Sequence, residues 1–208
     1  MRHTPQYVVD DPEEVKRLIR ENPWATIVSP TSNGVVASHY PVILEEGASG
    51  ISIVSHVGRP DEKLHELGAH EVLVIIQGPH GYISPGWYND PSDFVPTWNH
   101  VTAHLYGVPD ILSDEENFRV LDQLVDHFEE RMPHPLALDI DEQTARRIAK
   151  GTVGLRVVVT RFDARAKLSQ NKPSAMVDSI IDELQSGEQY ANPELAQEMR
   201  RVHGRDPQ

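Results

Sequence analysis

Residues 54–64 place a hydroxyl group, two cations and a predicted helix start close together along the chain. A predicted strand ends near Ser55 and His56, and a helix that carries Arg59 and Lys63 follows it. A hydroxyl, the free backbone amides of a helix start and two cations are groups that bind a small anion. An ordinary surface turn with solvated charges would have the same sequence, so both interpretations stay open.

Residues 161–173 form a second basic segment. Four cations (Arg161, Arg165, Lys167 and Lys172) stand against one carboxylate (Asp163), which gives this segment a net charge of 4 − 1 = +3. Three further hydrogen-bonding side chains, Ser169, Gln170 and Asn171, come directly before a helix predicted to begin at Pro173. Cations, amides and a helix N-terminus together can bind a phosphate group. A capped helix with surface cations is the alternative.

Other chemistries have no motif in the sequence. The chain has no cysteine, which excludes disulfides, thiolate metal sites and cysteine nucleophiles. It contains neither a phosphate-binding glycine motif nor a serine-nucleophile motif. His100 and His104 are four residues apart on an extended segment, so about 13 Å separates them and one metal ion cannot bridge them. The sequence therefore predicts no metal site, and the catalytic residues stay unknown.

Local patterns predict an α+β fold. Asp11-Pro12 starts a helix, Asn33-Gly34 turns a hairpin, and Ser113 with Glu116 forms a capping box. Strands are predicted at residues 24–29, 35–44, 51–57, 71–77, 95–112 and 154–162, and the segment QGPHGYISPGWY at 77–88 is predicted to form a further hairpin. Helices are predicted at residues 11–21, 60–67, 113–128, 141–150, 173–185 and 193–203. Hairpin-linked strands followed by helices predict an antiparallel barrel with peripheral helices.

Composition limits the class of protein. The 208 residues include 19 Lys and Arg against 32 Asp and Glu, a net charge of −13, so direct DNA binding is not expected. No apolar run reaches the roughly 20 residues of a membrane helix, and together with the lack of cysteine this predicts a cytoplasmic protein with no membrane partner. We expect one domain over residues 1–188 and a C-terminal helical tail over 189–208.

Three segments resemble the signatures of a known family. They are residues 74–88 (VIIQGPHGYISPGWY), 95–100 (VPTWNH) and 167–171 (KLSQN). In this order they resemble the PaiB family of FMN-binding negative transcriptional regulators, over residues 22–184. That family is similar to the FMN-binding split β-barrels, which include pyridoxamine phosphate oxidases and flavin reductases. The resemblance implies a split barrel, an FMN cofactor and a homodimer.

The resemblance also implies roles for particular residues. Cations at Arg59, Lys63 and Lys167 would neutralise the FMN phosphate. Hydrogen bonds to phosphate or flavin edges would come from Ser55, Ser169, Gln170 and Asn171, and His39, His56, Trp98 and Asn99 would line the ring. Relatives often read A-R-A-N-P-H/Q-W after the histidine, whereas this chain has GRPDEK at 58–63, which changes this wall of the site.

Function is less constrained than fold. A flavin-dependent regulator and an oxidoreductase both fit the resemblance, so whether the chain is an enzyme stays open. A split barrel that handles haem and a cofactor-free interaction scaffold are the alternatives. The ligand would be a flavin or another small anion.

Overall fold

The computed structural model describes residues 4–88 and 95–205. The chain divides into two compact units. The terminal unit comprises Met1–Asp10, Gln77–Thr102 and Asp163–Gln208, and the central unit comprises Asp11–Ile76 and Ala103–Phe162. Each unit is described by itself.

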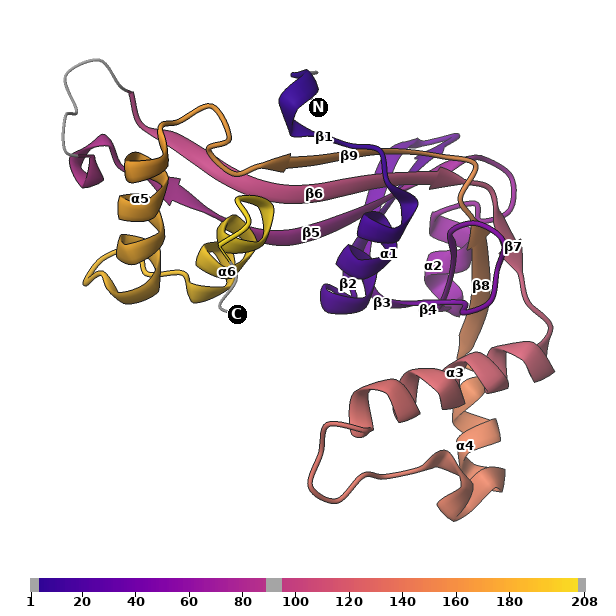
Figure 1. Ribbon diagram of the computed structural model, residues 1–208. Helices are drawn as coiled ribbons and strands as arrows, with labels where there is room; N and C mark the ends of the chain where they lie inside the picture. Colours follow the sequence, from indigo (N-terminus) through magenta and orange to yellow (C-terminus); the bar gives the residue numbers. More distant parts are fainter. Residues whose placement is uncertain (1–3, 89–94, 206–208) are drawn as a thin grey trace. The chain divides into compact units, whose positions relative to one another are not determined.

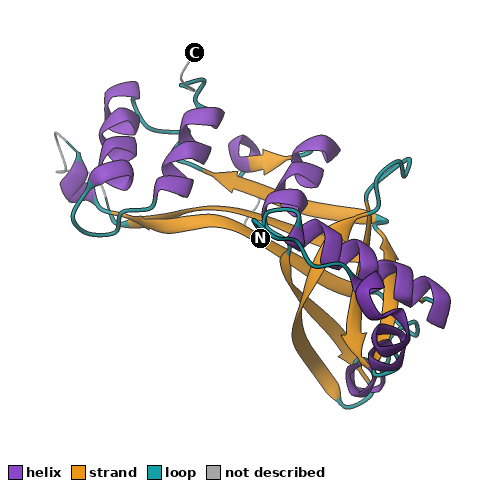
Figure 2. Cartoon of the chain, turned by 90° about the horizontal axis from the view of Figure 1, so that it is seen from below, coloured by secondary structure: helices purple, strands orange, loops and turns teal. Residues whose placement is uncertain are grey.

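Within the described residues, nine strands form a curled sheet in the order β1-β9-β6-β5-β2-β3-β4-β8-β7 (Figures 1 and 2). Their bounds are Val8–Val9 (β1), Trp24–Thr31 (β2), Gly34–Leu44 (β3), Ser52–Gly58 (β4), Val72–Ile83 (β5), Thr97–Gly107 (β6), Pro109–Ile111 (β7), Thr152–Val158 (β8) and Arg161–Lys167 (β9). In the central unit β2 pairs antiparallel with β3 and β5, β3 with β4, and β8 with β4 and β7. The predicted α+β split barrel is confirmed.

Six α-helices accompany the strands in the described part of the chain. They are α1 (Pro12–Glu21), α2 (Arg59–Leu64), α3 (Asp114–Glu129), α4 (Glu142–Ala149), α5 (Ser174–Ser186) and α6 (Pro193–Val202). Asp11 caps α1 by accepting a hydrogen bond from the Glu13 amide, and the predicted capping box of Ser113 and Glu116 starts α3. Both starts are confirmed because capping depends only on near neighbours in the sequence.

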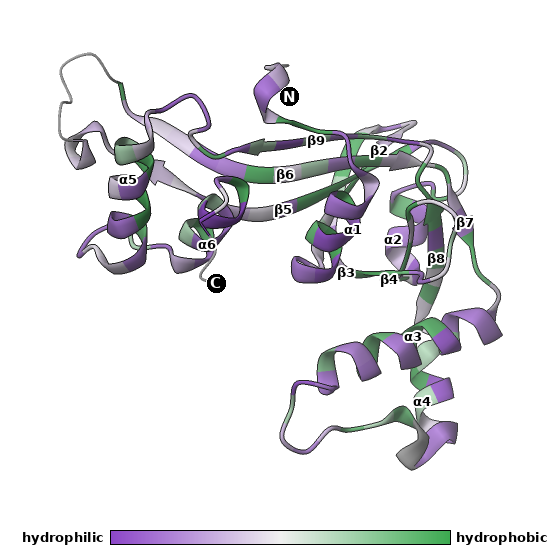
Figure 3. Ribbon diagram, in the orientation of Figure 1, coloured by the Kyte–Doolittle hydropathy of each residue, from purple (hydrophilic) through white to green (hydrophobic). Residues whose placement is uncertain are grey.

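The strands of the central unit bury an apolar core, with alternate residues buried on β2 and four consecutive residues on β4. Ile27, Val42, Ile53, Val74 and Val157 are each at most 2% exposed. On one side α3 packs Val120 and Leu124 against Val54 of β4, and Figure 3 shows hydrophobic positions recurring between the hydrophilic ones along this helix. This packing holds the end of β4, where the first candidate segment begins.

The segment at 77–88 forms no hairpin, so that prediction is wrong. Instead β5 continues to Ile83, and a 3-10 turn at Pro85–Trp87 follows it. Its glycines serve packing: a Cβ on Gly81 would lie 3.0 Å from Leu195 Cδ2 of α6. Glycine here allows a close approach and does not signal a turn.

Two boundaries also differ from expectation. The strand predicted at 154–162 belongs to two strands, because β8 ends at Val158 and β9 begins at Arg161. Pro173 is the N-cap of α5 rather than its first residue. Its ψ of 150° is extended, so the helix begins one residue later.

The C-terminal helices pack together in the terminal unit. In α5 the side chains of Val177, Ile180, Ile181 and Leu184 are buried, and in α6 those of Leu195, Ala196 and Met199. Asn192 caps α6 through the Leu195 amide at 3.0 Å. Residues 193–202 are therefore a packed helix. None of the helices in residues 4–88 and 95–205 is long and apolar enough to cross a membrane.

Candidate functional site

The predicted site residues fall into two groups, one in each unit. The central unit holds His39, Ser55, His56, Arg59 and Lys63, and the terminal unit holds Trp98, Asn99, Lys167, Ser169, Gln170 and Asn171. The structure brings some members of each group together, whereas others are engaged by the protein itself.

Ser55 is fully buried on β4. Its Oγ donates a hydrogen bond of 2.6 Å to the carbonyl oxygen of Pro41 on the neighbouring strand β3. The hydroxyl therefore links two strands, and it supports the end of β4 from within.

His56 presents a buried nitrogen atom that lacks a partner. Its ring lies edge-on to that of Tyr40, with 6.3 Å between centroids, and its Nδ1 has no hydrogen-bond partner among the described residues. Burial lowers the pKa of His56, which keeps the imidazole neutral at pH 7. An unsatisfied buried nitrogen is unfavourable unless a ligand or water completes its bond. A ligand that forms a hydrogen bond with His56 Nδ1 would therefore remove an unfavourable unsatisfied polar group.

His39 is exposed on β3 and contacts the neighbouring strand β2. Its Nδ1 is 3.0 Å from Thr26 Oγ1, and its ring stacks at 6.4 Å on Trp24. A hydrogen bond and a stacking contact therefore hold the His39 ring against β2.

Arg59 is held by backbone and carboxylate groups at the start of α2. Its Nε donates to the Lys150 carbonyl oxygen at 2.5 Å, and its Nη2 lies 3.1 Å from Asp114 Oδ1. One turn along α2, the exposed Lys63 has no ion-pair partner within residues 4–88 and 95–205.

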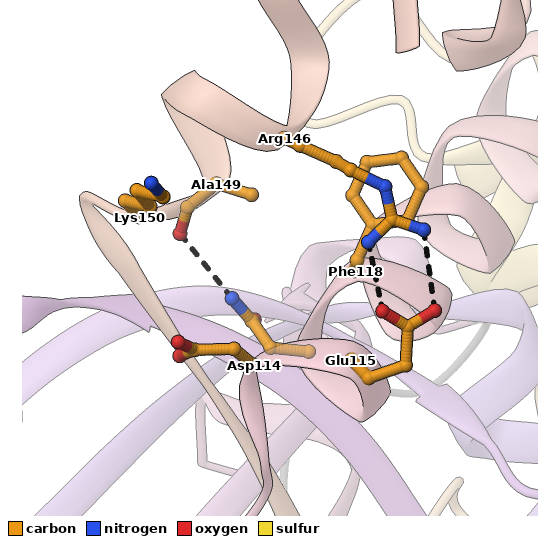
Figure 4. A pocket seen from close by; sticks show the side chains of 7 residues that line it. Asp114, Glu115, Phe118, Arg146, Ala149 and Lys150 are labelled. Carbon is orange, nitrogen blue, oxygen red and sulfur yellow. Dashed lines mark hydrogen bonds and ion pairs between the residues drawn. The ribbon is translucent and has the colours of Figure 1, made fainter. Parts of the chain in front are cut away.

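A small cavity of about 140 Å³ adjoins the partners of Arg59 (Figure 4). Its lining residues are Asp114, Glu115, Asn117, Phe118, Arg146, Ala149 and Lys150. Arg146 covers the Phe118 ring at 4.2 Å and bonds both oxygens of Glu115, at 2.8 and 3.2 Å. Arg146 and Glu115 of its wall are therefore paired with each other, which suits a structural joint between α3 and α4 better than an anion site.

Lys167 is the most distinctive cation of the terminal unit. Its Nζ donates to Thr97 Oγ1 and, at 2.6 Å, to the Trp98 carbonyl oxygen. Within the described part of the chain no carboxylate pairs with it. Burial, and secondarily the charge of Lys172, lower the pKa of Lys167. The ammonium group is therefore half-buried among neutral oxygens without a counter-ion.

The turn after Lys167 is fixed by internal hydrogen bonds. Asn99 and Ser169 are buried, and Asn99 Nδ2 donates to Ser169 Oγ at 2.9 Å. Gln170 bonds two nearby backbone groups, the Leu168 amide at 2.7 Å and the Ala166 carbonyl at 2.5 Å. Asn99, Ser169 and Gln170 thus position the turn, whereas Asn171 is exposed.

An aromatic surface lies next to this turn. Trp98 is 55% exposed, and its ring stacks on His80 and meets Tyr82 edge-on, each with 6.4 Å between centroids. Tyr190 continues the surface at 5.1 Å from Tyr82. The backbone carbonyl of Trp98 accepts a hydrogen bond from Lys167, so Trp98 links an exposed flat ring to the half-buried cation.

Residues 1–161 match a family model described as "Putative FMN-binding domain". The chain belongs to this FMN-binding family. It is also 30% identical, over 95% of its length and 96% of the relative's, to "Protease synthase and sporulation protein PAI 2" of Bacillus subtilis. The resemblance to the PaiB family is thereby confirmed, and FMN is the cofactor that the family description gives.

Solved structures of other proteins show the same fold. The flavocytochrome Anf3 of Azotobacter vinelandii superposes with a TM-score of 0.59 at 13% identity, over 80% of this chain and 72% of that one. The FAD and heme binding protein of Mycobacterium smegmatis gives 0.58 at 17% identity, over 85% and 80%. At these identities the likeness shows the fold of the FMN-binding family member and not its chemistry.

The donor sets of this FMN-binding chain fit the cofactor. FMN requires cations or amides for its phosphate, polar partners for its ring edge and flat apolar surfaces for its ring. Lys167 and Lys63 are cations without carboxylate partners in the described residues, His56 Nδ1 is an unsatisfied nitrogen, and Trp98 is an exposed ring. When bound, FMN would supply redox chemistry, and the donors of the unit that binds it would hold and orient it.

The sequence did not reveal one polar cluster in this FMN-binding fold. Tyr40 and Ser38 on β3 bond Asp61 on α2, and His65 bonds Ser38. Two polar residues spaced two apart on a strand indicate a shared polar face. Their partner on a helix more than twenty residues away leaves no local signal.

Proposed function

We propose that this chain is an FMN-dependent oxidoreductase. The observation that supports it most is Lys167, a half-buried ammonium group among neutral oxygens that has no carboxylate partner in the described residues. Such a cation is unfavourable alone and favourable beside an anion, as a phosphate would be. The match of residues 1–161 to an FMN-binding family supports the phosphate of FMN as that anion.

The candidate residues then divide into two roles. In the terminal unit Lys167 and Asn171 contact the phosphate, and Trp98 contacts the flavin ring. In the central unit Arg59 and Lys63 form the second candidate site for a phosphate, and His56 and His39 are the candidate contacts of a flavin ring there. The remaining four hold these side chains in place through their internal bonds: Ser55, Asn99, Ser169 and Gln170. Among residues 4–88 and 95–205 no acid stands out for proton transfer, so we assign to the chain the binding and orientation of FMN and of a small substrate.

Absorption spectroscopy of the purified protein tests this proposal. We expect flavin bands after incubation with FMN and gel filtration, and bleaching of those bands by NADH or NADPH without oxygen. Failure to retain FMN would refute the proposal. A Soret band would favour the haem-handling alternative instead.

A regulatory role is the second candidate, supported by likeness over nearly the whole chain to a protein named for protease synthase and sporulation. The net charge of −13 argues against direct contact with DNA phosphates. Regulation would then act through the flavin or a protein partner. A nanomolar complex of the pure protein with a defined operator at physiological salt would contradict this.

The functional form is proposed to be a homodimer. In the central unit Trp24 is 64% exposed and Val35 is 76% exposed. Large apolar side chains left in water mark surfaces that associate. Light scattering at micromolar concentration should give about twice the mass of the chain, and a monomer would contradict the proposal.

A further inference from the structure

Helix α2 is held in place without apolar burial. None of its residues is buried, and its leucine, Leu64, is 52% exposed. Most short helices of a protein depend on a buried apolar face for their stability. The position of α2, which carries Arg59 and Lys63, must therefore depend on polar contacts.

Asp61 makes the first of these contacts. Its Oδ2 accepts a hydrogen bond of 2.6 Å from the Tyr40 hydroxyl and one of 3.1 Å from Ser38 Oγ. The same Tyr40 oxygen accepts a bond of 3.2 Å from the amide of Gly58, the residue before α2. Tyr40 thus links the carboxylate of the helix to the backbone turn that leads into it.

His65 makes the second contact, at the end of α2. It is 2% exposed, with Nδ1 at 2.8 Å from Ser29 Oγ and Nε2 at 2.9 Å from Ser38 Oγ. Because Ser38 donates its proton to Asp61, it must accept from Nε2–H, and Nδ1 then accepts from Ser29. This tautomer is neutral, in agreement with the lowering of the pKa of His65 by burial.

We propose that Asp61 and Tyr40 are positioning residues for the phosphate of FMN. They fix the Gly58 amide and α2, and so place Arg59 and Lys63 for an anion. This inference rests on the proposed FMN site. A carboxylate close to a phosphate site opposes anion binding through its charge. If Asp61 acts only through its charge, its removal should therefore strengthen FMN binding, whereas if it positions α2, its removal should weaken FMN binding.

The matched control lies on the next residue of the helix. Glu62 carries the same charge as Asp61, and its side chain has no partner among the described residues. Asp61→Ala and Tyr40→Phe are expected to weaken FMN binding about tenfold, the effect of one lost hydrogen bond to a charged group. Glu62→Ala should leave FMN binding unchanged or slightly tighter. Riboflavin, which lacks the phosphate, should bind all four proteins equally.

Hydrogen exchange without ligand provides an independent measurement. Asp61→Ala and Tyr40→Phe should each speed amide exchange in residues 58–66 and leave β2 and β8 protected. Glu62→Ala should leave exchange in residues 58–66 unchanged. If wild type binds FMN and the variants bind it equally, the inference is wrong. If wild type does not bind FMN, the proposed function fails. Unchanged amide exchange in residues 58–66 of Asp61→Ala and Tyr40→Phe would show that Asp61 and Tyr40 do not position α2.

Discussion

Replacing Gly107 with alanine is expected to lower the free energy of unfolding by about 3 kcal/mol, at the upper end of overpacking effects. A Cβ at this position would lie 2.5 Å from the Val158 carbonyl oxygen and 2.8 Å from Val157 Cγ1. These atoms cannot easily move aside, because Val157 of β8 pairs with Ile53 of β4 and with Pro109 of β7. Insertion of one methyl group must therefore disturb the pairing of three strands.

Urea denaturation of wild type and variant measures this loss, with Gly50→Ala as the control. Around Gly50 an added Cβ meets no atom within 4 Å, and its φ is not positive. The control should change the free energy of unfolding by less than about 0.5 kcal/mol. Equal stability of Gly107→Ala and wild type would mean that Val157 and Val158 of β8 can move aside despite their strand pairing.

Local chemistry explains which parts of the fold were predictable. Asp11 with Pro12, and Ser113 with Glu116, set helix starts through bonds between residues at most three apart. The alternating burial along β2 likewise follows from one buried face. These signals depend on near neighbours, so a single sequence contains them.

The errors arise where distant residues decide. Gly81 resembles a turn residue, yet the side chain of Leu195 requires it. The sequence also could not show that Asn99, 70 residues before Ser169, donates a hydrogen bond to its hydroxyl. The contact of Arg59 with Lys150 uses a backbone carbonyl, and side-chain types cannot indicate it. The local sequence therefore identifies polar segments, and only the tertiary contacts show which of their polar groups remain available to bind a ligand.

Removal of the Lys167 ammonium group is expected to weaken FMN binding about ten- to a hundred-fold, the contribution of one charge-assisted hydrogen bond. Lys167→Ala removes the charge and also the bonds to Thr97 and Trp98. Lys167→Gln keeps a donor for those oxygens and removes the charge alone. A similar loss in both variants would attribute the effect to the charge. Isothermal titration with FMN and with riboflavin measures it, and riboflavin binding should change little.

The control and the pH profile make this prediction specific. Lys16→Ala removes a partly buried lysine of α1 that pairs with Glu13 one turn away, and it should alter FMN affinity little. Because burial and Lys172 lower the pKa of Lys167, its charge is lost at a lower pH than that of an ordinary lysine. FMN affinity of the wild type should accordingly decline as pH rises, beginning below the usual lysine range, and Lys167→Gln should lack this decline. Equal FMN affinities for Lys167→Gln, Lys16→Ala and wild type would exclude Lys167 from the phosphate site and leave Arg59 and Lys63 as its cations.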